Sequence, residues 1–367
     1  MRRALLICDA DFAVRERALL DRLAIGLLDA GLRIVMALPA SVCDSAEDFV
    51  ERVPYAPPTV ARPARHAARQ LWRTLADRGL DTDRAPLSLI HVFGSSAWSV
   101  AARLGAMVGA PVVVEAWTAD LARRAARDAA GLGHAGDPVV SVPGAGLIEA
   151  CSGCAIRPTV CAWGARAPDR PPTRPPGAQP TAVLVVNPAR QARARVALRA
   201  LAGVARDEDA LILADAGAFD ASAGLWRFAR SIGLESRLSL IPDLESRRSP
   251  ALDADALIVV LEPGEHRSVL LDAMASESVV IASADPLCDW LRPDQTGLIV
   301  DDAGDESAWG GAFAAALSRS ASAGETARRA RRWVIEHRRA SRHIADTLAL
   351  YERIAGLKIR SHRPAAG

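Results

Sequence analysis

The sequence predicts an α/β protein with two domains, each built on a parallel β-sheet. The chain has 367 residues, which is too long for one ordinary hydrophobic core and suits two domains of about 150 to 180 residues each. Short apolar runs alternate with longer helical patterns throughout, as in parallel sheets with crossover helices. One proline-rich stretch interrupts this alternation near the middle of the chain.

The first half holds six apolar runs that we predict to be strands. They are Ala4–Cys8, Arg33–Leu38, Leu87–Phe93, Pro111–Glu115, Pro138–Val142 and Thr159–Trp163. Helical patterns separate them. The clearest is Arg15–Ala30, because its leucines fall on one face and Gly31 follows as a typical helix stop. We therefore expect a first parallel-sheet domain over residues 1–165.

Residues 166–180, RAPDRPPTRPPGAQP, contain six prolines in fifteen positions. Proline lacks an amide hydrogen and fixes its own φ, so this density forbids both helices and sheet ladders. We expect a stiff, extended linker. A second domain over residues 181–340 follows, with six predicted strands: Ala182–Val186, Ala210–Ala214, Arg237–Ile241, Leu257–Leu261, Val279–Ser283 and Leu298–Val300.

The chain ends in a basic amphipathic pattern, Thr326–Ile354, that predicts a long helix or a pair of helices. Its many arginines allow a peripheral contact with an anionic membrane. The alternative is a solvated helix face with arginine in the usual place of lysine, and we favour it because the sequence contains a single lysine, Lys358. The last part carries apolar residues that need a surface, so we expect residues 341–360 to pack back on the first domain.

Composition excludes several classes of protein. Half of the residues are apolar, which excludes global disorder, and the net charge of +2 gives no electrostatic footprint for nucleic acid. The six cysteines are scattered over a chain with ample core, which favours free thiols in a reducing compartment. The apolar stretch near Met1 is too short for a signal peptide, and no run reaches the roughly 18 residues needed to span a bilayer. We expect a cytoplasmic protein.

The segment Ala256–Ala275, ALIVVLEPGEHRSVLLDAMA, is the richest candidate for a functional site. A predicted buried strand ends at Leu261, a polar loop follows, and a helix begins near Ser268. Parallel sheets bind ligands beyond the carboxyl ends of their strands, where the free N–H groups of a helix N-terminus attract phosphate. Asp272, one turn into the helix, is placed to accept hydrogen bonds from sugar hydroxyls. The alternative is an ordinary strand–loop–helix unit whose acids stabilise the helix dipole.

This segment resembles the donor-binding segment of GT-B glycosyltransferases of the retaining, family-4 type. That family has an alanine–aspartate pair before a strand, then a Glu-Gly-Phe-Gly loop and a Leu-Glu-Ala-Met-Ala helix start. Here Ala254-Asp255 precedes the strand and Leu271–Ala275 reads LDAMA. Further on, Val279–Ser283 and Asp294–Val300 resemble the family's next strand and its Thr-Gly-Leu-Leu-Val stretch. The resemblance implies two Rossmann-like domains whose parallel sheets face each other across a cleft, the first for the acceptor and the second for the nucleotide-sugar donor.

The resemblance also implies roles for residues around the loop. Asp272 matches the second of the family's two glutamates and would hold the ribose hydroxyls. The first glutamate position falls on Gly264, so Glu265, one place later, would lie at the donor sugar. His266 and Arg267 stand in the family's glycine-rich loop and would bind the diphosphate, next to Ser268 at the helix start.

The family's diphosphate-binding arginine and lysine would fall within residues 187–195. Pro188 stands at the position of that arginine. Arg190 and Arg193 are the nearest cations that could replace the pair, and Arg195 is a third.

Two other candidates lie outside this segment. His91, at the end of a predicted strand, is either a catalytic residue that contacts the acceptor or a core histidine with satisfied partners. Cys151, Cys154 and Cys161 offer three thiolates without an obvious fourth ligand, whereas zinc sites need four ligands or three with a water. We therefore expect no metal site.

The resemblance implies an enzyme that transfers a sugar from a nucleoside-diphosphate sugar to a glycan or small-molecule acceptor. Transfer would retain the configuration of the sugar and use no cofactor besides the donor, with Glu265 or His91 as the catalytic candidate. The alternative is a catalytically inactive GT-B protein that acts as a glycan-binding or partner module. The departures from the family's loop favour this alternative.

Overall fold

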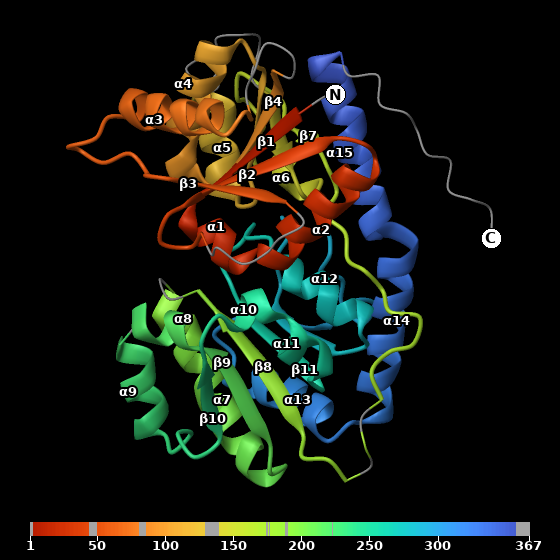
Figure 1. The fold of residues 1–367 in the computed structure, drawn as a ribbon. Coiled ribbons are helices and arrows are strands. Elements are labelled where there is room, and N and C mark those ends of the chain that lie inside the picture. The colour runs from red at the N-terminus through yellow and green to blue at the C-terminus, as the bar shows by residue number, and fades with distance from the viewer. Residues whose placement is uncertain are drawn as a thin grey trace. The chain divides into compact units, whose positions relative to one another are not determined.

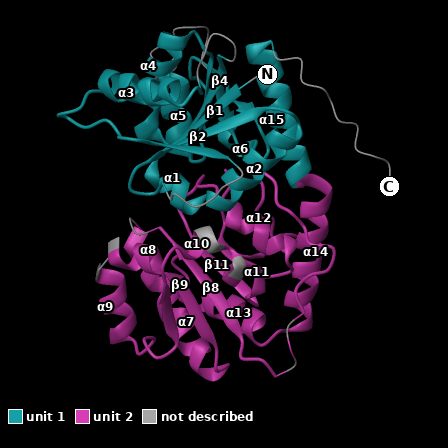
Figure 2. Cartoon of the chain, viewed as in Figure 1, with its two compact units in different colours: residues 1–162, 340–367 teal, residues 163–339 magenta. Residues whose placement is uncertain are grey.

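Figure 1 shows the fold of the chain in a computed structural model. The structure describes residues 3–43, 50–80, 86–128, 139–173, 175, 177–187, 190–221 and 223–356. The chain divides into two compact units, Met1–Ala162 with Ala340–Gly367, and Trp163–Arg339 (Figure 2). Within the described residues, no helix combines the length and the apolar character needed to cross a membrane.

A seven-stranded parallel sheet forms the centre of the first unit, in the order β3-β2-β1-β4-β5-β6-β7. Strand β1, inside the sheet, is buried along its whole length, as expected for a parallel strand covered on both faces. The strands are β1 Arg3–Cys8, β2 Arg33–Pro39, β3 Glu51–Tyr55, β4 Leu87–Phe93, β5 Val112–Glu115, β6 Val139–Val142 and β7 Thr159–Val160.

Strand β3 is the element that the sequence analysis did not predict. Its sequence, ERVPY, lacks a continuous apolar run and contains Pro54, which cannot donate to a sheet ladder. The strand lies at the edge of the sheet and pairs only with β2, where such a residue is tolerated. The Tyr55 hydroxyl donates to the carbonyl of Cys8 at 3.0 Å, which ties this edge strand to the end of β1.

The helices of the first unit agree with the predicted alternation, with one break. The predicted helix Arg15–Ala30 is two helices, because the regular hydrogen bonding is interrupted at Glu16. Gly31 follows with a φ of +86°, a conformation that favours glycine. The helices are α1 Ala10–Arg15, α2 Arg17–Asp29, α3 Ala64–Asp77, α4 Trp98–Val108, α5 Ala119–Asp128, α6 Gly146–Glu149 and α15 Ala340–Ala355.

Helix α15, from the end of the described chain, packs against α2 and β4. The approach is close at Gly26, where an added Cβ would overlap Ile344 Cδ1. Further along α15, the hydroxyl of Tyr351 lies 2.8 Å from Nδ1 of His91, which is on β4. The last helix is therefore part of the core of the first unit.

The second unit is built on a six-stranded parallel sheet in the order β10-β9-β8-β11-β12-β13. Helices α7 and α13 pack together over one apolar cluster, and α12 packs against α14. The strands are β8 Thr181–Val186, β9 Leu211–Asp215, β10 Leu238–Ile241, β11 Ala256–Val260, β12 Val279–Ser283 and β13 Leu298–Val300. The helices are α7 Gln191–Asp207, α8 Ala216–Ala221, α9 Ala223–Ser231, α10 Leu244–Arg247, α11 Ser249–Asp253, α12 Ser268–Ala275, α13 Glu306–Leu317 and α14 Ala321–His337.

The proline-rich segment 166–180 belongs to the second unit in its described residues. Arginine side chains hold its backbone: Arg331 donates to the carbonyl of Pro168, and Arg319 Nη2 donates to that of Ala178 at 3.0 Å. Charge-assisted hydrogen bonds therefore hold the segment to the second unit.

The predicted basic C-terminal pattern forms two helices, α14 and α15, with a break at residues 338–339. Arg328 and Arg332 of α14 both pair with Glu325, at 2.9 and 3.2 Å. Arg331 is largely buried, and Arg329 donates to the carbonyl of Asp294. The sequence analysis considered these arginines as a contact for an anionic membrane. Their pairing within the chain favours the alternative, an ordinary solvated helix face.

We expect Gly26→Ala to destabilise the first unit by about 1–3 kcal/mol, because the new methyl group overlaps Ile344 on α15. Ile344→Ala in the same chain should remove this penalty. Gly203→Ala in the middle of α7 is the matched control: no atom outside its own helix turn lies within 4 Å of the new Cβ, so the change should stabilise by about 0.5–1 kcal/mol. Denaturant unfolding measures all three, and equal effects at Gly26 and Gly203 would contradict the packing.

Candidate functional site

The candidate site of the second unit lies where the strand order of its sheet reverses. Strands β8 and β11 are neighbours, but the chain continues from β8 to β9 on one side and from β11 to β12 on the other. Ligands of open α/β sheets bind in the crevice beyond the carboxyl ends of such a pair. Asn187 follows β8, and the loop 261–267 follows β11, so both lie at this point.

Glu265 is the centre of the loop after β11. Its carboxylate accepts from Asn187 Nδ2 at 2.8 Å, from the backbone N–H of Glu262 at 3.3 Å and from Arg267 Nη1 at 3.3 Å. The side chain is buried, and these bonds fix its orientation. The structure thus brings together a residue at the end of β8 and the predicted Glu265.

Gly264 gives the loop its shape. Its φ of +78° is in the left-handed region that favours glycine, and its N–H donates to Asp285 Oδ2 at 2.7 Å. Burial raises the pKa of Asp285, and the hydrogen bond from Gly264 counteracts part of that rise. The loop after β11 is therefore tied to the chain that follows β12.

Arg267 points inward and is neutralised by two carboxylates. It is 1% exposed and forms ion pairs with Glu245, on α10, and with Glu265. The sequence analysis expected this guanidinium to bind a diphosphate. In the structure its charge is already matched by Glu245, a partner that no sequence pattern marked.

Arg248 forms a second buried pair beside the first. Its Nη2 donates to Ser268 Oγ at 2.8 Å, and its Nε lies 3.6 Å from Asp272 Oδ2. Asp272 is only 4% exposed. The backbone of Arg248 has φ +59° and ψ −39°, a strained conformation for a residue with a side chain. The chain therefore accepts strain at Arg248 while its guanidinium reaches the start of α12.

These contacts define what we call the switch-point cluster: Glu245, Arg248, Glu265, Arg267, Ser268 and Asp272. Two guanidinium groups face three carboxylates, so the cluster holds no surplus of positive charge for a phosphate. The N-terminus of α12, which begins in this cluster, has no side-chain cap hydrogen bond, and its helix dipole makes this end electropositive.

His266 lies in the same loop but faces the interior. It is fully buried, with Nδ1 3.3 Å from the carbonyl of Gly264 and its ring edge-on to Trp290 at 4.7 Å. Burial lowers the pKa of His266 to about 4. At neutral pH the ring is uncharged. It therefore supplies no positive charge for the diphosphate that the sequence analysis expected it to bind.

The remaining predicted cations lie at the start of α7. Arg190 pairs with Glu262 and is half exposed. Arg193 lines a cavity of about 410 Å³ together with Pro263, Ser283 and Asp302. Pro188, at the family's arginine position, lies outside the described residues.

In the first unit, His91 is a core histidine with satisfied partners. It is on β4, two residues before the end of the strand, and is 2% exposed. Its Nδ1 contacts the Tyr351 hydroxyl at 2.8 Å and its Nε2 contacts Glu115 Oε2 at 3.3 Å. Burial alone would raise the pKa of Glu115, but the hydrogen bond and charge of His91 hold it below its ordinary value. The interior location disagrees with the predicted contact to an acceptor.

The sequence analysis did not single out Asp9. This residue follows β1 and lies beside β4, where the strand order of the first sheet reverses. It caps α1 by accepting from the N–H of Phe12 at 2.9 Å, and burial raises its pKa. Gly94, at φ +89°, makes room for it, since a Cβ there would overlap the carboxylate. Its only signal in the sequence was an acid directly after a buried strand.

All six cysteines are free thiols. Among the described residues, no group of three or more histidine, cysteine or acidic side chains is arranged to hold a metal ion. Cys151 and Cys154 interact with each other, but Cys161 points at the carbonyl of Asp346, so the structure does not bring all three candidate thiols together.

Arg248→Ala should destabilise the second unit by about 3–5 kcal/mol, because it leaves the buried Asp272 without this cation. Arg248→Gly loses the same contacts but relieves the positive φ, so it should be milder by about 1 kcal/mol. Arg230→Ala, which removes an exposed pair with Glu235, is the control and should cost less than about 1 kcal/mol. Chemical denaturation measures the free energy of unfolding of the three variants. If Arg248→Ala lowers it no more than Arg230→Ala does, the cluster does not stabilise the unit.

His266 makes stability depend on pH. Its folded pKa of about 4 lies below that of an exposed histidine, about 6.5, so the unfolded chain binds a proton first as the pH falls. Stability should therefore be complete above about pH 6.5 and decrease by up to about 3 kcal/mol towards pH 4. His266→Phe keeps a ring against Trp290 and cannot titrate. The slope of unfolding free energy between pH 4.5 and 6.5 should be smaller in this variant, and equal slopes would contradict the burial of a neutral ring.

Comparisons with known proteins find likeness in structure alone. No family model matches the sequence, and no curated protein matches it. Solved structures similar to this chain include Anabaena HepE in complex with UDP and glucose, at 13% identity and a TM-score of 0.72, and sucrose-phosphate synthase from Thermosynechococcus elongatus, at 14% and 0.71. Each alignment covers 97% of this chain and 100% of the other. A glycosyltransferase from Rickettsia africae aligns at 13% identity and a TM-score of 0.67, over 96% of this chain and 98% of that one.

At such low sequence identity, the structural likeness shows a shared fold and does not show a shared activity. The similar structures are GT-B glycosyltransferases, and each alignment spans nearly the whole of both chains. The two parallel sheets, each flanked by helices, have the corresponding topology. The chain has the GT-B fold, as the sequence analysis expected.

Proposed function

We propose that the chain transfers a glycosyl group from a nucleoside-diphosphate sugar to a glycan or small-molecule acceptor. The observation that carries this proposal is the switch-point cluster, a set of polar side chains oriented at the carboxyl ends of β8 and β11. A full-length likeness to HepE, which was solved with UDP and glucose, supports a nucleotide-sugar as the ligand.

Asp272 would accept hydrogen bonds from the ribose. It stands in the second turn of α12, and Arg248 and Ser268 already orient the polar groups around it. The uncapped N-terminus of α12 would receive a phosphate oxygen. The first unit would bind the acceptor.

Glu265 would lie at the donor sugar. Cleavage of a glycosidic bond builds positive charge on the sugar ring, and a fixed carboxylate stabilises that charge. Asn187 and Arg267 fix the carboxylate in the free protein, so it needs no reorganisation during the reaction. We place transfer with retention here, without a metal.

The departing diphosphate needs cations outside the cluster. Arg193 and Arg190, at the start of α7, are the candidates, because Arg267 and Arg248 are buried against carboxylates, whereas Arg193 is partly exposed and the pair of Arg190 with Glu262 is open to solvent. A guanidinium at the N-terminal end of a helix adds its charge to that of the helix dipole.

A second function, binding without transfer, is favoured by one observation. Arg267 occupies the loop where the family that the sequence resembles has glycine, and its pairs with Glu245 and Glu265 close the loop on itself. Such a site would retain a nucleotide or glycan while lacking the cation that accelerates departure of the diphosphate.

A ligand panel tests both functions. UDP, GDP and ADP, and the glucose derivative of each, are added at millimolar concentration while the unfolding temperature is measured, and nucleotide release from each sugar donor is followed with and without candidate acceptors. Binding of one nucleotide to the folded chain raises its stability by mass action. Binding with release supports transfer, binding without release supports the second function, and no binding contradicts both.

Arg193→Gln should weaken the nucleotide found in this panel about tenfold, as expected for loss of one charge-assisted contact of about 1.4 kcal/mol. The unfolding temperature of the free variant should not change, because Arg193 is partly exposed. Arg199→Gln, an exposed arginine of the same helix that pairs with Glu306, is the matched control and should bind as the parent chain does. Equal affinity of the two variants would exclude Arg193 from the site.

A further inference from the structure

Helix α3 exposes an unusual outer face. Its inner face buries Ala67, Ala68, Leu71 and Leu75. On the opposite side Arg65, Arg69 and Arg73 follow each other at intervals of four, so they form one stripe along the helix. All three are exposed, and within the described chain none of them forms an ion pair.

Trp72 borders this arginine stripe. It follows Arg65 by seven positions and Ala68 by four, which places it between the stripe and the buried face of the helix. The side chain is 39% exposed. A tryptophan among arginines is the composition of helices that lie at the surface of a bilayer, with the indole at the level of the headgroups.

The turn before α3 presents a second apolar residue. Thr59 and Arg62 exchange two backbone hydrogen bonds of 2.9 and 3.0 Å, and the Thr59 hydroxyl accepts a third at 3.1 Å. This leaves Val60 and Ala61 at the tip of a closed turn, with Val60 105% exposed. Figure 1 shows that the connection between β3 and α3 projects from the first unit. The apolar tip is thus part of a turn closed by its own hydrogen bonds.

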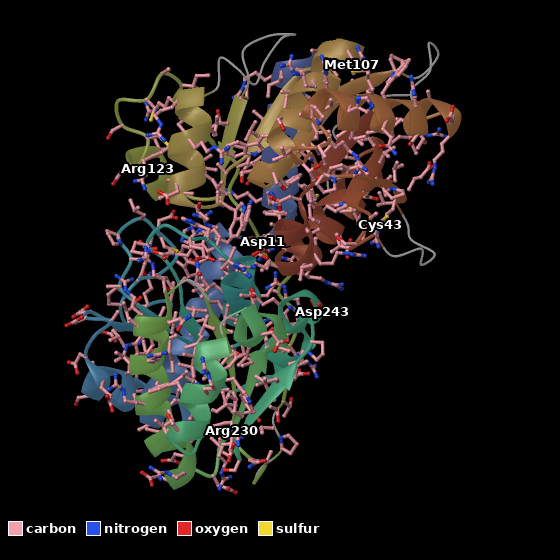
Figure 3. All side chains as sticks on the ribbon, turned by 90° about the vertical axis from the view of Figure 1, so that its left-hand side faces the viewer. Asp11, Cys43, Met107, Arg123, Arg230 and Asp243 are labelled. Carbon is pink, nitrogen blue, oxygen red and sulfur yellow. The ribbon has the colours of Figure 1, made fainter. Side chains whose placement is uncertain are left out.

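Large exposed apolar residues concentrate here. Val60 and Trp72 belong to this segment, and Met107, 43% exposed and labelled in Figure 3, lies on α4, which packs against α3; Ile25 on α2 is the other large exposed apolar residue of the described chain. Between Thr59 and Gly79 the sequence has five arginines and one aspartate. The surface therefore combines exposed apolar groups with an excess of positive charge.

We propose that the outer face of α3 and the Thr59–Arg62 turn form a docking surface for an anionic lipid bilayer. The arginine stripe would contact lipid headgroups, and Trp72 and Val60 would enter the boundary between headgroups and acyl chains. Charge complementarity commits the surface to anionic lipid, because the arginines lack carboxylate partners within the described chain. This surface is separate from the switch-point cluster and does not depend on the proposed function.

The test is sedimentation of the full chain with vesicles of phosphatidylcholine alone or with 30% phosphatidylglycerol. The parent chain should bind only the anionic vesicles, and binding should weaken at 0.5 M salt because screening shortens the range of the attraction. Arg65→Gln/Arg69→Gln/Arg73→Gln should reduce binding about 100-fold, at roughly tenfold or less for each arginine. The matched control is Arg328→Gln/Arg329→Gln/Arg332→Gln, which removes the same charge from α14 and should bind like the parent.

Depth of insertion gives an independent measurement. Brominated acyl chains should quench tryptophan fluorescence of the parent chain more than that of Trp72→Phe, and Val60→Ser should weaken binding without changing the unfolding temperature. The proposal is overturned if the parent chain does not bind anionic vesicles, or if the α14 control loses as much binding as the α3 variant. Binding to a polyanion such as poly(U) RNA without binding to vesicles would likewise overturn it and identify a nucleic-acid surface.

Discussion

The second unit depends on the neutralisation of Arg267, a full positive charge with almost no access to solvent. An unpaired ion at this depth would cost several kcal/mol, so the chain must supply anions from wherever the fold places them. Glu245 comes from α10 and Glu265 from the same loop as Arg267. Glu265 in turn takes a hydrogen bond from Asn187, at the end of β8. One buried charge thus connects β8, α10 and the loop after β11.

The first unit also contains a buried ionisable group that needs polar partners, the carboxylate of Glu115. Glu115 is buried on β5, and His91 on the neighbouring strand and Tyr351 on α15 complete a chain of polar contacts around it. Because Tyr351 comes from the last helix, these contacts join that helix to the sheet. In both units, buried polar groups fix where a helix or loop lies, while apolar packing supplies most of the stabilisation.

The sequence was sufficient to predict two parallel-sheet domains because most strands are apolar runs, whose type does not depend on distant partners, and the GT-B fold followed from the family resemblance. Strand β3 was not predicted, because ERVPY is stabilised by its position at the sheet edge and by the Tyr55–Cys8 hydrogen bond. Both are visible only in the folded chain. The local elements of the candidate site residues were predictable, but their contacts were not. Glu265 and Asp272 follow from the loop and helix after β11, whereas Glu245 and Arg248 lie on short segments without any motif. A pattern identifies residues that share a local element, and a tertiary ion pair has no such pattern.

The same pairs bear on how a nucleotide could be held. A diphosphate that engaged Arg267 would have to displace Glu245 or Glu265, and every 1.4 kcal/mol spent on that exchange lowers the affinity tenfold. Arg193 and Arg190 are more exposed, so a ligand can contact them without opening the buried cluster. Under the proposed function, the cluster would support the loop and the start of α12, and the amides of α12 and the arginines of α7 would supply the positive charge for a phosphate. The shape of the site and its charge would then come from different residues, so we expect variants of Arg248 to act on folding and variants of Arg193 to act on ligand binding.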